Sequence, residues 1–316
     1  FEGDGGFSID CGLKMFGHTG LENPKKSFKI NFRGRYGQDF LTYPVYGEDG
    51  PQIYDSLCIR AGQDYPKTVF RDELFTSLCR DASDTVLAQR DKFCILYING
   101  DYFGIYCMKE AFGEMMYAQN YDVNADSVTV IQAPVGVDSP MFDLIRFCLD
   151  NDLSIQENYD YYASQMDVDS LIDYHLFGLV SCGLDAYGKN QIYMTYDGQK
   201  WIASMYDMDS TWGLWWTGQS FVSANYARSE FQDYQEGSGN LLYIRLENMF
   251  TQEIRSRWDE MKNGPLSTDN ILNRFERFTD IAPDTLVRED YAATTGNGAY
   301  IGIPSQTTNH IQQIRS

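Results

Sequence analysis

The spacing of apolar residues changes along this 316-residue chain, and that change constrains the fold. Polar and apolar side chains alternate in residues 26–32, which predicts a β-strand. Asn99-Gly100 separates two further apolar runs, residues 93–98 and 102–108, and this arrangement is a strong signal for a β-hairpin. From Ala111 onward, apolar residues recur mainly at helical spacing. The pattern therefore predicts an α+β chain that is β-rich first and mainly helical afterwards.

The helical spacing also indicates where individual elements lie. Helices are expected over residues 68–81, 114–120, 139–151, 167–180, 240–262 and 268–281. A second hairpin-like unit is expected within the helical part, with strands at 191–196 and 200–206 and a turn at Asp197-Gly198. A short strand is expected at 128–131. We expect two lobes, a β-rich lobe of residues 1–132 and a helical lobe of residues 133–316.

The net charge of the chain excludes some classes of partner. Lys and Arg number 25 and Asp and Glu 45, which gives a net charge of −20. A chain this acidic would repel nucleic-acid phosphates and an anionic membrane surface, so we expect neither as a partner. Aromatic residues make up 15% of the chain, which argues against disorder.

The charge is distributed unevenly. Residues 1–110 hold 13 Lys and Arg against 16 Asp and Glu, whereas residues 111–316 hold 12 against 29. The segment from Lys14 to Arg35 carries six basic residues and one acid, Glu22. A local basic segment in an acidic protein is a candidate anion site. The alternative is an ordinary solvent-exposed strand face whose basic side chains bind no anion.

The cysteines and the hydropathy bear on the compartment. The seven cysteines include no Cys-x-x-Cys pair, so neither a zinc ribbon nor a thioredoxin motif is supported. We expect reduced thiols, mostly buried, in a cytosol or an anaerobic exterior. No run of 18 apolar residues occurs, so no membrane span is expected. Because Phe1 is not a natural start, the sequence is interpreted as an excised domain.

Acidic and amide side chains flank the second hairpin. Asp185 is followed five residues later by Asn190, and the hairpin then leads to Asp207 and Asp209. This order is typical of phosphoryl-transfer sites, where the first Asp deprotonates or orients a hydroxyl and the later groups hold Mg²⁺. Mg²⁺ prefers such hard oxygen ligands. Taken alone, the Asp-x4-Asn spacing is weak, and a turn residue and a solvated strand end are the alternatives.

The basic segment supplies candidate phosphate ligands. A turn at residues 17–20 precedes the strand that carries Lys26 and Lys29, as in a phosphate-covering loop followed by a phosphate-binding lysine. Strand alternation places Lys26 and Lys29 on opposite sides, and the sequence does not say which of them faces a ligand. Arg71 near the start of the inserted helix and Glu110 at the hairpin end are further candidates.

The chain resembles the CotH kinase family, the spore-coat protein H group of atypical protein kinases. The residues that carry the resemblance are Gly17-His18-Thr19-Gly20, Pro24 to Lys29, Leu57 to Asp64, Phe70-Arg71-Asp72, Leu96 to Tyr106 with Glu110, Asp167 to Tyr174, Asp185 with Asn190, and Lys200-Trp201-Ile202 leading to Tyr206-Asp207-Met208-Asp209. Their order and spacing agree with the family from about residue 12 to residue 214. The helix expected near residues 240–261 is similar to the family's later region.

This resemblance implies a two-lobed, kinase-like fold that binds ATP with Mg²⁺ or Mn²⁺ and phosphorylates protein Ser or Thr. Asp185 would be the catalytic Asp, and the metal ligands would be Asn190, Asp207 and Asp209. The nucleotide-binding residues would be Lys26, Lys29, Thr19, Arg71 and Glu110. One departure is that family members often carry Arg before the first glycine and Ser after it, whereas here Phe16 precedes Gly17 and the hydroxyl of the turn comes from Thr19.

Two other readings remain open at the level of sequence. A catalytically inactive, CotH-like scaffold module that binds protein or polysaccharide in a secreted, cellulosome-type assembly is the main alternative to a kinase. A glycosidase using Asp207 and Asp209 is a weaker one, because no cleft is implied. Under the leading hypothesis the partners are ATP and a protein substrate, and the location is secreted or on a cell or spore surface, in an anaerobic bacterium.

Overall fold

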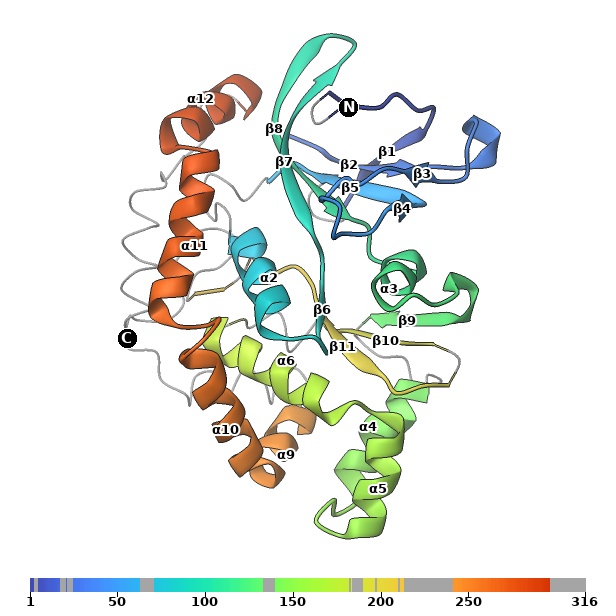
Figure 1. Cartoon of the computed structure of the whole chain (residues 1–316), viewed down its shortest axis with the longest axis vertical. Helices are drawn as coiled ribbons and strands as arrows, with labels where there is room; N and C mark the ends of the chain where they lie inside the picture. The colour runs from blue at the N-terminus through green and yellow to red at the C-terminus, as the bar shows by residue number, and fades with distance from the viewer. Residues whose placement is uncertain are drawn as a thin grey trace. The chain divides into compact units, whose positions relative to one another are not determined.

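The computed structural model describes residues 1–2, 5–17, 21, 25–62, 71–132, 140–181, 183, 190–196, 198–209, 211–212 and 241–295. The chain divides into two compact units (Figure 1). Unit 1 consists of Phe1–Tyr65, Gln89–Asp126 and Thr285–Tyr300, and unit 2 of Pro66–Ala88, Ser127–Asp284 and Ile301–Ser316. These compact units are discontinuous in sequence. The functional division at residue 132 is a separate matter and stays a prediction.

Unit 1 contains a five-stranded antiparallel sheet. Its strand order is β1 (Gly12–Phe16), β2 (Ser27–Asn31), β5 (Ser56–Arg60), β8 (Asp101–Glu110) and β7 (Asp91–Ile98). A two-stranded sheet, β3 (Leu41–Thr42) with β4 (Ile53–Tyr54), lies in the same unit. Asn99 and Gly100 join β7 to β8 with φ angles of 56° and 89°, as a two-residue hairpin turn of type I′ requires. The predicted strand at 26–32 and the predicted hairpin are confirmed.

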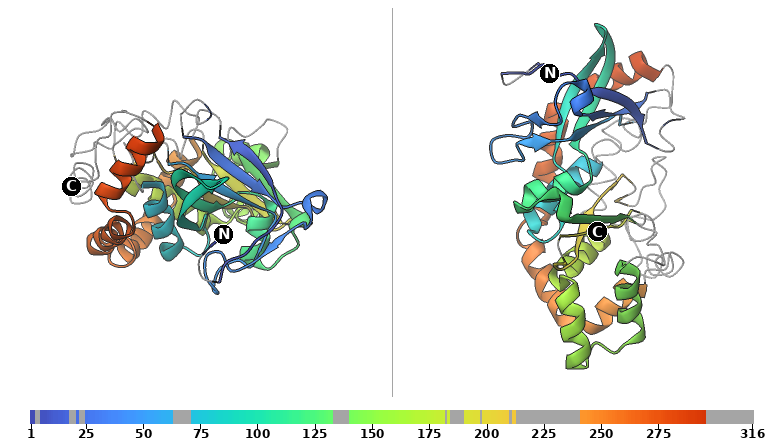
Figure 2. Two further views of the ribbon diagram at one scale, coloured as in Figure 1. Left: turned by 90° about the horizontal axis from the view of Figure 1, so that it is seen from above. Right: turned by 90° about the vertical axis from the view of Figure 1, so that its right-hand side faces the viewer.

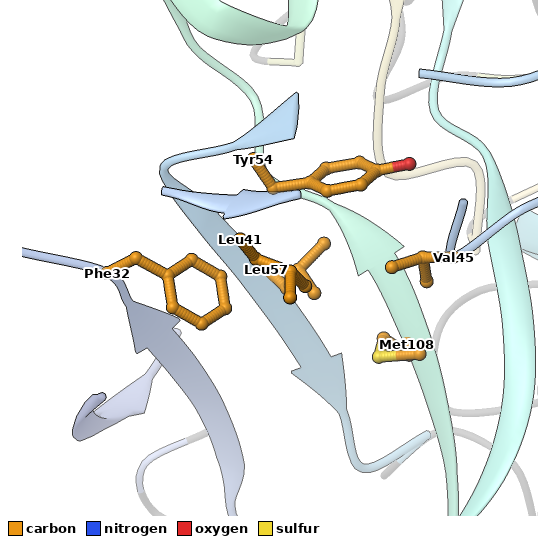
Figure 3. Packing of buried hydrophobic residues seen from close by; sticks show 6 residues of the cluster. All are labelled: Phe32, Leu41, Val45, Tyr54, Leu57 and Met108. Carbon is orange, nitrogen blue, oxygen red and sulfur yellow. The ribbon is translucent and has the colours of Figure 1, made fainter. Parts of the chain in front are cut away.

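One face of this sheet carries the core of unit 1. Alternation along each strand puts Leu57 and Ile59 of β5 on the same face as Tyr106 and Met108 of β8. The buried residues of the larger cluster are Phe32, Leu41, Val45, Tyr54, Leu57 and Met108 (Figure 3). Because the apolar residues occupy alternate positions, the intervening side chains of the same strands lie on the opposite face.

Unit 2 contains a four-stranded sheet covered by helices. The strand order is β6 (Leu87–Ala88), β11 (Ile202–Met205), β10 (Ile192–Tyr196) and β9 (Val128–Gln132). The pairs are antiparallel except for β6 with β11. Helix α6 (Val168–Ser181) packs against β11, and α2 (Arg71–Ala82) packs against β6. The second hairpin and the short strand predicted from the sequence are therefore present.

The remaining helices are α3 (Glu114–Tyr121) and α12 (Asp284–Thr295), with α4 (Pro140–Asp150), α5 (Gln156–Gln165), α9 (Leu241–Met249), α10 (Thr251–Lys262) and α11 (Thr268–Ile281). Helix α4 packs beside α5 and α9 (Figure 2). The single helix expected over 240–262 is wrong, because Phe250 leaves the helical conformation (φ −112°, ψ 35°) between α9 and α10. Among the described residues, no helix is long and apolar enough to span a bilayer.

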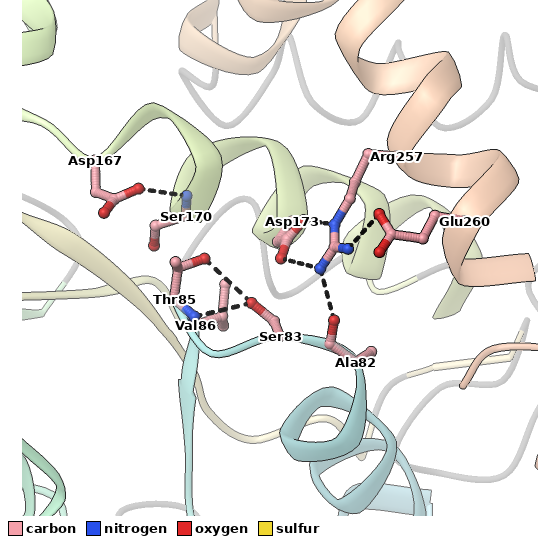
Figure 4. A network of polar contacts seen from close by, with 9 residues as sticks. All are labelled: Ala82, Ser83, Thr85, Val86, Asp167, Ser170, Asp173, Arg257 and Glu260. Atoms are coloured by element: carbon pink, nitrogen blue, oxygen red, sulfur yellow. Dashed lines mark hydrogen bonds and ion pairs between the residues drawn. The ribbon is translucent and has the colours of Figure 1, made fainter. Parts of the chain in front are cut away.

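A polar network holds three helices of unit 2 together (Figure 4). Arg257 of α10 donates from Nε and Nη2 to both carboxylate oxygens of Asp173 on α6, at 2.7 and 2.9 Å. Its Nη2 also donates to the carbonyl of Ala82 at the end of α2, at 2.7 Å. The Asp173 carboxylate raises the pKa of Arg257. Such a bidentate pair fixes orientation as well as distance, so this Arg positions α2 and α6.

Candidate functional site

A short loop after β11 carries two of the candidate metal ligands. Asp207 and Asp209 follow the buried strand β11, and both side chains are half-buried. The backbone of Asp207 has a φ of 58°, in the left-handed region that a non-glycine residue adopts rarely. Strained residues of this kind concentrate at functional sites and persist where the surroundings hold them. The loop therefore needs an anchor.

Helix α2 anchors this loop. The Asp72 carboxylate accepts a hydrogen bond from the backbone amide of Met208 at 3.0 Å. The neighbouring Arg71, fully buried, donates from Nη1 to the carbonyl of Thr211 at 2.7 Å. Within the loop, the Thr211 hydroxyl donates to the carbonyl of Met208 at 2.8 Å. Hydrogen bonds from the start of α2 therefore hold the loop on both sides of Asp209.

Arg71 contacts protein backbone inside unit 2. The sequence singled out Arg71 as a nucleotide ligand, and that role stays a prediction. The observed hydrogen bond gives Arg71 a different role, which is to position the loop that carries Asp207. The adjacent Asp72, which the sequence did not single out as a site residue, shares this role. Its signal in the sequence was the Arg71-Asp72 pair at the start of a helix.

The structure brings Asn190 to the same loop. Its side-chain amide, only 3% exposed, donates to the backbone carbonyl of Asp207 at 3.5 Å. The hairpin of β10 and β11 accounts for this proximity, because it brings the residue before β10 near the residues after β11. The sequence predicted this proximity from the hairpin. The side-chain oxygens of Asn190, Asp207 and Asp209 are hard ligands that suit Mg²⁺ or Mn²⁺.

Two predicted site residues lie outside the described residues. These are Asp185, the predicted catalytic Asp, and Thr19 of the predicted phosphate loop. Within the ranges that the structure describes, no group of three or more His, Cys, Asp or Glu side chains is placed to hold a metal ion. Asn190, Asp207 and Asp209 together offer one amide and two carboxylates, donor types that suit a divalent cation, and their role as metal ligands stays a prediction.

Basic side chains form a row across the other face of the unit 1 sheet. Residues directly opposite one another across an antiparallel pair point to the same face. Lys14 of β1 is opposite Lys29 of β2, Lys29 is opposite Cys58 of β5, and Cys58 is opposite Lys109 of β8. Arg60 lies two residues beyond Cys58 and therefore on that same face. We call Lys14, Lys29, Arg60 and Lys109 the basic row.

The basic row brings two like charges together at the Lys14 and Lys29 end, whereas Lys109 at the other end is directly opposite Asp91 of β7. Like charges directly opposite one another across a strand pair are destabilising, and Lys14 and Lys29 are such a pair. The Lys29 ammonium makes no hydrogen bond or ion pair with the described part of the chain. Cys58 lies between Lys29 and Lys109 in the register of the sheet. Burial raises the pKa of its thiol, and the charges of Lys29, Arg60 and Lys109 oppose that rise. A row of this kind fits a polyanion such as phosphate.

The structure distinguishes between the two candidate lysines. Lys26 precedes β2, and its ammonium donates to the backbone carbonyl of Leu21 at 2.6 Å. Lys29 lies within the strand and belongs to the basic row. Lys109 and Arg60 were missed as site residues, because they join Lys29 only through the register of β2, β5 and β8. No local signal in the sequence places either residue beside Lys29.

Glu110 is not brought to the basic row. It is opposite Leu57 of β5, so its side chain belongs to the core face of the sheet. The carboxylate, on a residue only 2% exposed, accepts from the backbone amide of Arg90 at 2.6 Å. It also lies 3.6 Å from the Arg90 guanidinium. A role for Glu110 as partner of Lys29 is therefore not supported by the sheet register, and its nucleotide-binding role stays a prediction.

The fold and these residues define an α+β protein with a basic sheet face in one unit and a carboxylate-bearing loop in the other. A family model described as CotH kinase protein matches residues 13–140 and 137–316. The chain belongs to this family, which confirms the resemblance found in the sequence. The predicted α+β class is confirmed as well. A comparison with curated proteins gave no match.

Proposed function

We propose that this chain is an atypical Ser/Thr protein kinase that transfers the γ-phosphate of ATP to a protein. The observation that carries the proposal is the basic row, in which Lys14 and Lys29 lie directly opposite each other on the adjacent strands β1 and β2. Membership of the CotH kinase family supports the same activity class. In a chain with a net charge of −20, two lysines directly opposite each other on one sheet face suit the phosphates of a nucleotide.

The proposed metal ligands are Asn190, Asp207 and Asp209. The support is local, since the amide of Asn190 contacts the backbone of Asp207 and α2 anchors the loop through Met208. A bound Mg²⁺ or Mn²⁺ supplies positive charge that offsets the charge of the nucleotide phosphates. The protein's own contribution is to hold the carboxylates in place before the nucleotide arrives, so that binding orders little else.

The proposed reaction follows the family's chemistry. Asp185 accepts the proton of the substrate Ser or Thr hydroxyl while that oxygen bonds to the γ-phosphorus. The bond from the γ-phosphorus to its bridging oxygen breaks, and ADP leaves. The proposed nucleotide ligands are Lys29 first, from its place in the basic row, with Lys26, Thr19, Arg71 and Glu110 as further candidates from the resemblance.

The test is autophosphorylation with labelled ATP and Mn²⁺. We expect incorporation by the native chain and its loss in Asp185→Ala and in Asp207→Ala. A variant at an exposed acid outside the loop, Asp269→Ala, is the matched control and should retain activity. Incorporation that survives both site substitutions would rule out this assignment of the site.

The alternative is an inactive, kinase-like module that serves as a scaffold component. The thermal shift with ATP and metal separates the two. A stabilising shift that Lys29→Met removes supports nucleotide binding, whereas no shift at millimolar nucleotide, about the top of the usual KM range, supports the scaffold. For the active kinase, we propose an extracellular or coat protein as substrate and a secreted, cell-surface or spore-surface location. Polysaccharide-associated partners belong to the scaffold alternative.

A further inference from the structure

Helices of unit 2 border an open cavity that the proposed site does not use. It lies among α6, α10 and α11 and has a volume of about 680 Å³. This is within the range of roughly 300–1,000 Å³ that is usual for small-molecule sites. Its apolar lining includes Leu176, Val180, Ile254, Trp258, Leu266 and Ile271. A cavity of this size and lining suits an organic ligand with a large apolar body.

The charged residues of the lining are of one sign. Arg255 and Lys262, both on α10, line the cavity, and no Asp or Glu is among the lining residues that the structure describes. This stands out in a chain that carries 45 acids against 25 basic residues. Lys262 pairs with Asp259 one turn earlier. Arg255 is exposed and makes no hydrogen bond or ion pair within the described ranges, so its guanidinium is available to an anion.

A buried donor on the cavity wall gives a second, independent indication of a ligand. Trp212 lines the cavity and is 3% exposed. Its indole Nε1–H has no hydrogen-bond partner among the residues that the structure describes. Buried polar groups are nearly always hydrogen-bonded, since leaving one unsatisfied costs free energy. An acceptor oxygen on a bound molecule would satisfy this group.

We propose that this cavity binds an amphiphilic organic anion. The apolar body of the ligand lies against the leucine, isoleucine and Trp258 side chains. Its anionic group pairs with Arg255, and an oxygen of the ligand accepts from Trp212 Nε1. An apolar wall with a few placed polar groups is the usual composition of such a site. The proposal does not depend on kinase activity, because every residue in it lies outside the proposed nucleotide and metal ligands.

The experiment uses two fluorescent probes that differ in one group. The anionic probe is 1-anilinonaphthalene-8-sulfonate, and the neutral probe is N-phenyl-1-naphthylamine, the same ring system without the sulfonate. Each is titrated into the full chain without ATP or metal. We expect saturable binding of the sulfonate. In Arg255→Gln its affinity should fall about tenfold, since a charge-assisted contact is lost, and the affinity of the neutral probe should stay within about twofold.

Two further variants make the result specific. Arg277→Gln removes an exposed Arg on α11 that does not line the cavity, and it should leave both affinities unchanged. Trp212→Phe keeps an aromatic ring and removes the donor, and it should weaken the sulfonate about threefold or more. Circular dichroism and the thermal midpoint establish that each variant is folded.

Several results would overturn the proposal. They are an absence of saturable sulfonate binding, equal sulfonate affinity in the native chain and Arg255→Gln, or equal weakening by Arg277→Gln, which would indicate a general effect of charge. Unchanged sulfonate affinity in folded Trp212→Phe would overturn the assignment of the indole as a ligand donor. All of these readouts are independent of ATP, so failure of the proposed function leaves them unaffected.

Discussion

The carboxylate of Asp72 accepts a hydrogen bond from the backbone amide of Met208 at 3.0 Å, across 136 positions of sequence. Met208 lies between Asp207 and Asp209, the two carboxylates proposed to bind metal. The first turn of α2 therefore holds the backbone at the centre of the candidate metal loop. Because Asp207 has a φ of 58°, the loop adopts a conformation that needs such support.

Replacing Asp72 by Ala should loosen this loop. Asp72 is 8% exposed, and its loss leaves the buried amide of Met208 without that acceptor, at a cost of about 1–3 kcal/mol. We expect a lower free energy of unfolding in urea and weaker binding of Mn²⁺ with nucleotide. Asp81→Ala on the same helix is the control, since the Asp81 side chain is 48% exposed and its ion pair with Arg274 should contribute less than about 1 kcal/mol. Equal stability of Asp72→Ala and the native chain would contradict the anchor.

Substitution of Lys29 by Met should separate binding from stability. Lys14 and Lys29 are directly opposite, so removing one charge should leave the free energy of unfolding unchanged or raise it by up to about 1 kcal/mol. The affinity for ATP, measured by calorimetry, should fall about tenfold or more because a phosphate contact is lost.

Lys26→Met is the matched control for Lys29. Its ammonium donates to the carbonyl of Leu21 in an exposed setting, and we expect a smaller loss of ATP affinity. A larger loss in Lys26→Met than in Lys29→Met would reverse the order that the sheet register indicates.

Features that depend on short stretches of sequence were predictable. The hairpin at Asn99-Gly100 follows from a turn that requires positive φ at both positions, and the strand of Lys29 follows from a period of two. The helix break at Phe250 was not predictable from spacing, because apolar residues continue through it. Helix α5 was missed because its sequence shows no apolar stripe, and in the structure Tyr162 is its one buried residue.

Features that depend on pairing between distant segments were not predictable. The basic row exists only through the registers of β1, β2, β5 and β8, so Lys109 could not be assigned to it from sequence. Arg71 was expected to bind a nucleotide, and its full burial against the Thr211 carbonyl arises from the packing of α2. The buried pairing of Lys25 with Asp290 joins residues 265 positions apart.

That buried pair should dominate the stability of unit 1. Lys25 Nζ lies 2.8 Å from Asp290 Oδ2, with both side chains 6% exposed. Asp290 also accepts from the Tyr102 hydroxyl at 2.7 Å and from the Ile105 amide at 2.8 Å. Removing one partner of a buried pair leaves an uncompensated charge, so Asp290→Ala should lower the free energy of unfolding by about 3–5 kcal/mol at neutral pH.

The pH dependence of this loss has a definite sign. Burial lowers the pKa of Lys25 below its usual 10.5, and Asp290 opposes that fall. Without Asp290 the pKa of Lys25 should fall further. Between the folded pKa and 10.5 the unfolded chain binds more protons, so this group's contribution to stability rises with pH. The deficit of Asp290→Ala, measured in urea titrations, should therefore shrink as the pH rises from neutral toward 10.5. A constant deficit would show that Lys25 keeps its proton in the variant.

Gly104 makes room for the same Asp290 carboxylate. Its φ is +121°, and a Cβ added there would lie 2.4 Å from Asp290 Oδ1 and 2.8 Å from Thr294 Cγ2. Gly104→Ala should therefore carry both backbone strain and a clash, and we expect a loss of more than about 2 kcal/mol in the free energy of unfolding. Gly100→Ala in the turn of the same hairpin is the control. Its φ is +89°, but a Cβ there meets nothing within 4 Å, so it should carry the strain alone, about 1 kcal/mol. Urea unfolding of both variants gives the difference, and equal losses would mean that the carboxylate of Asp290 moves aside without cost.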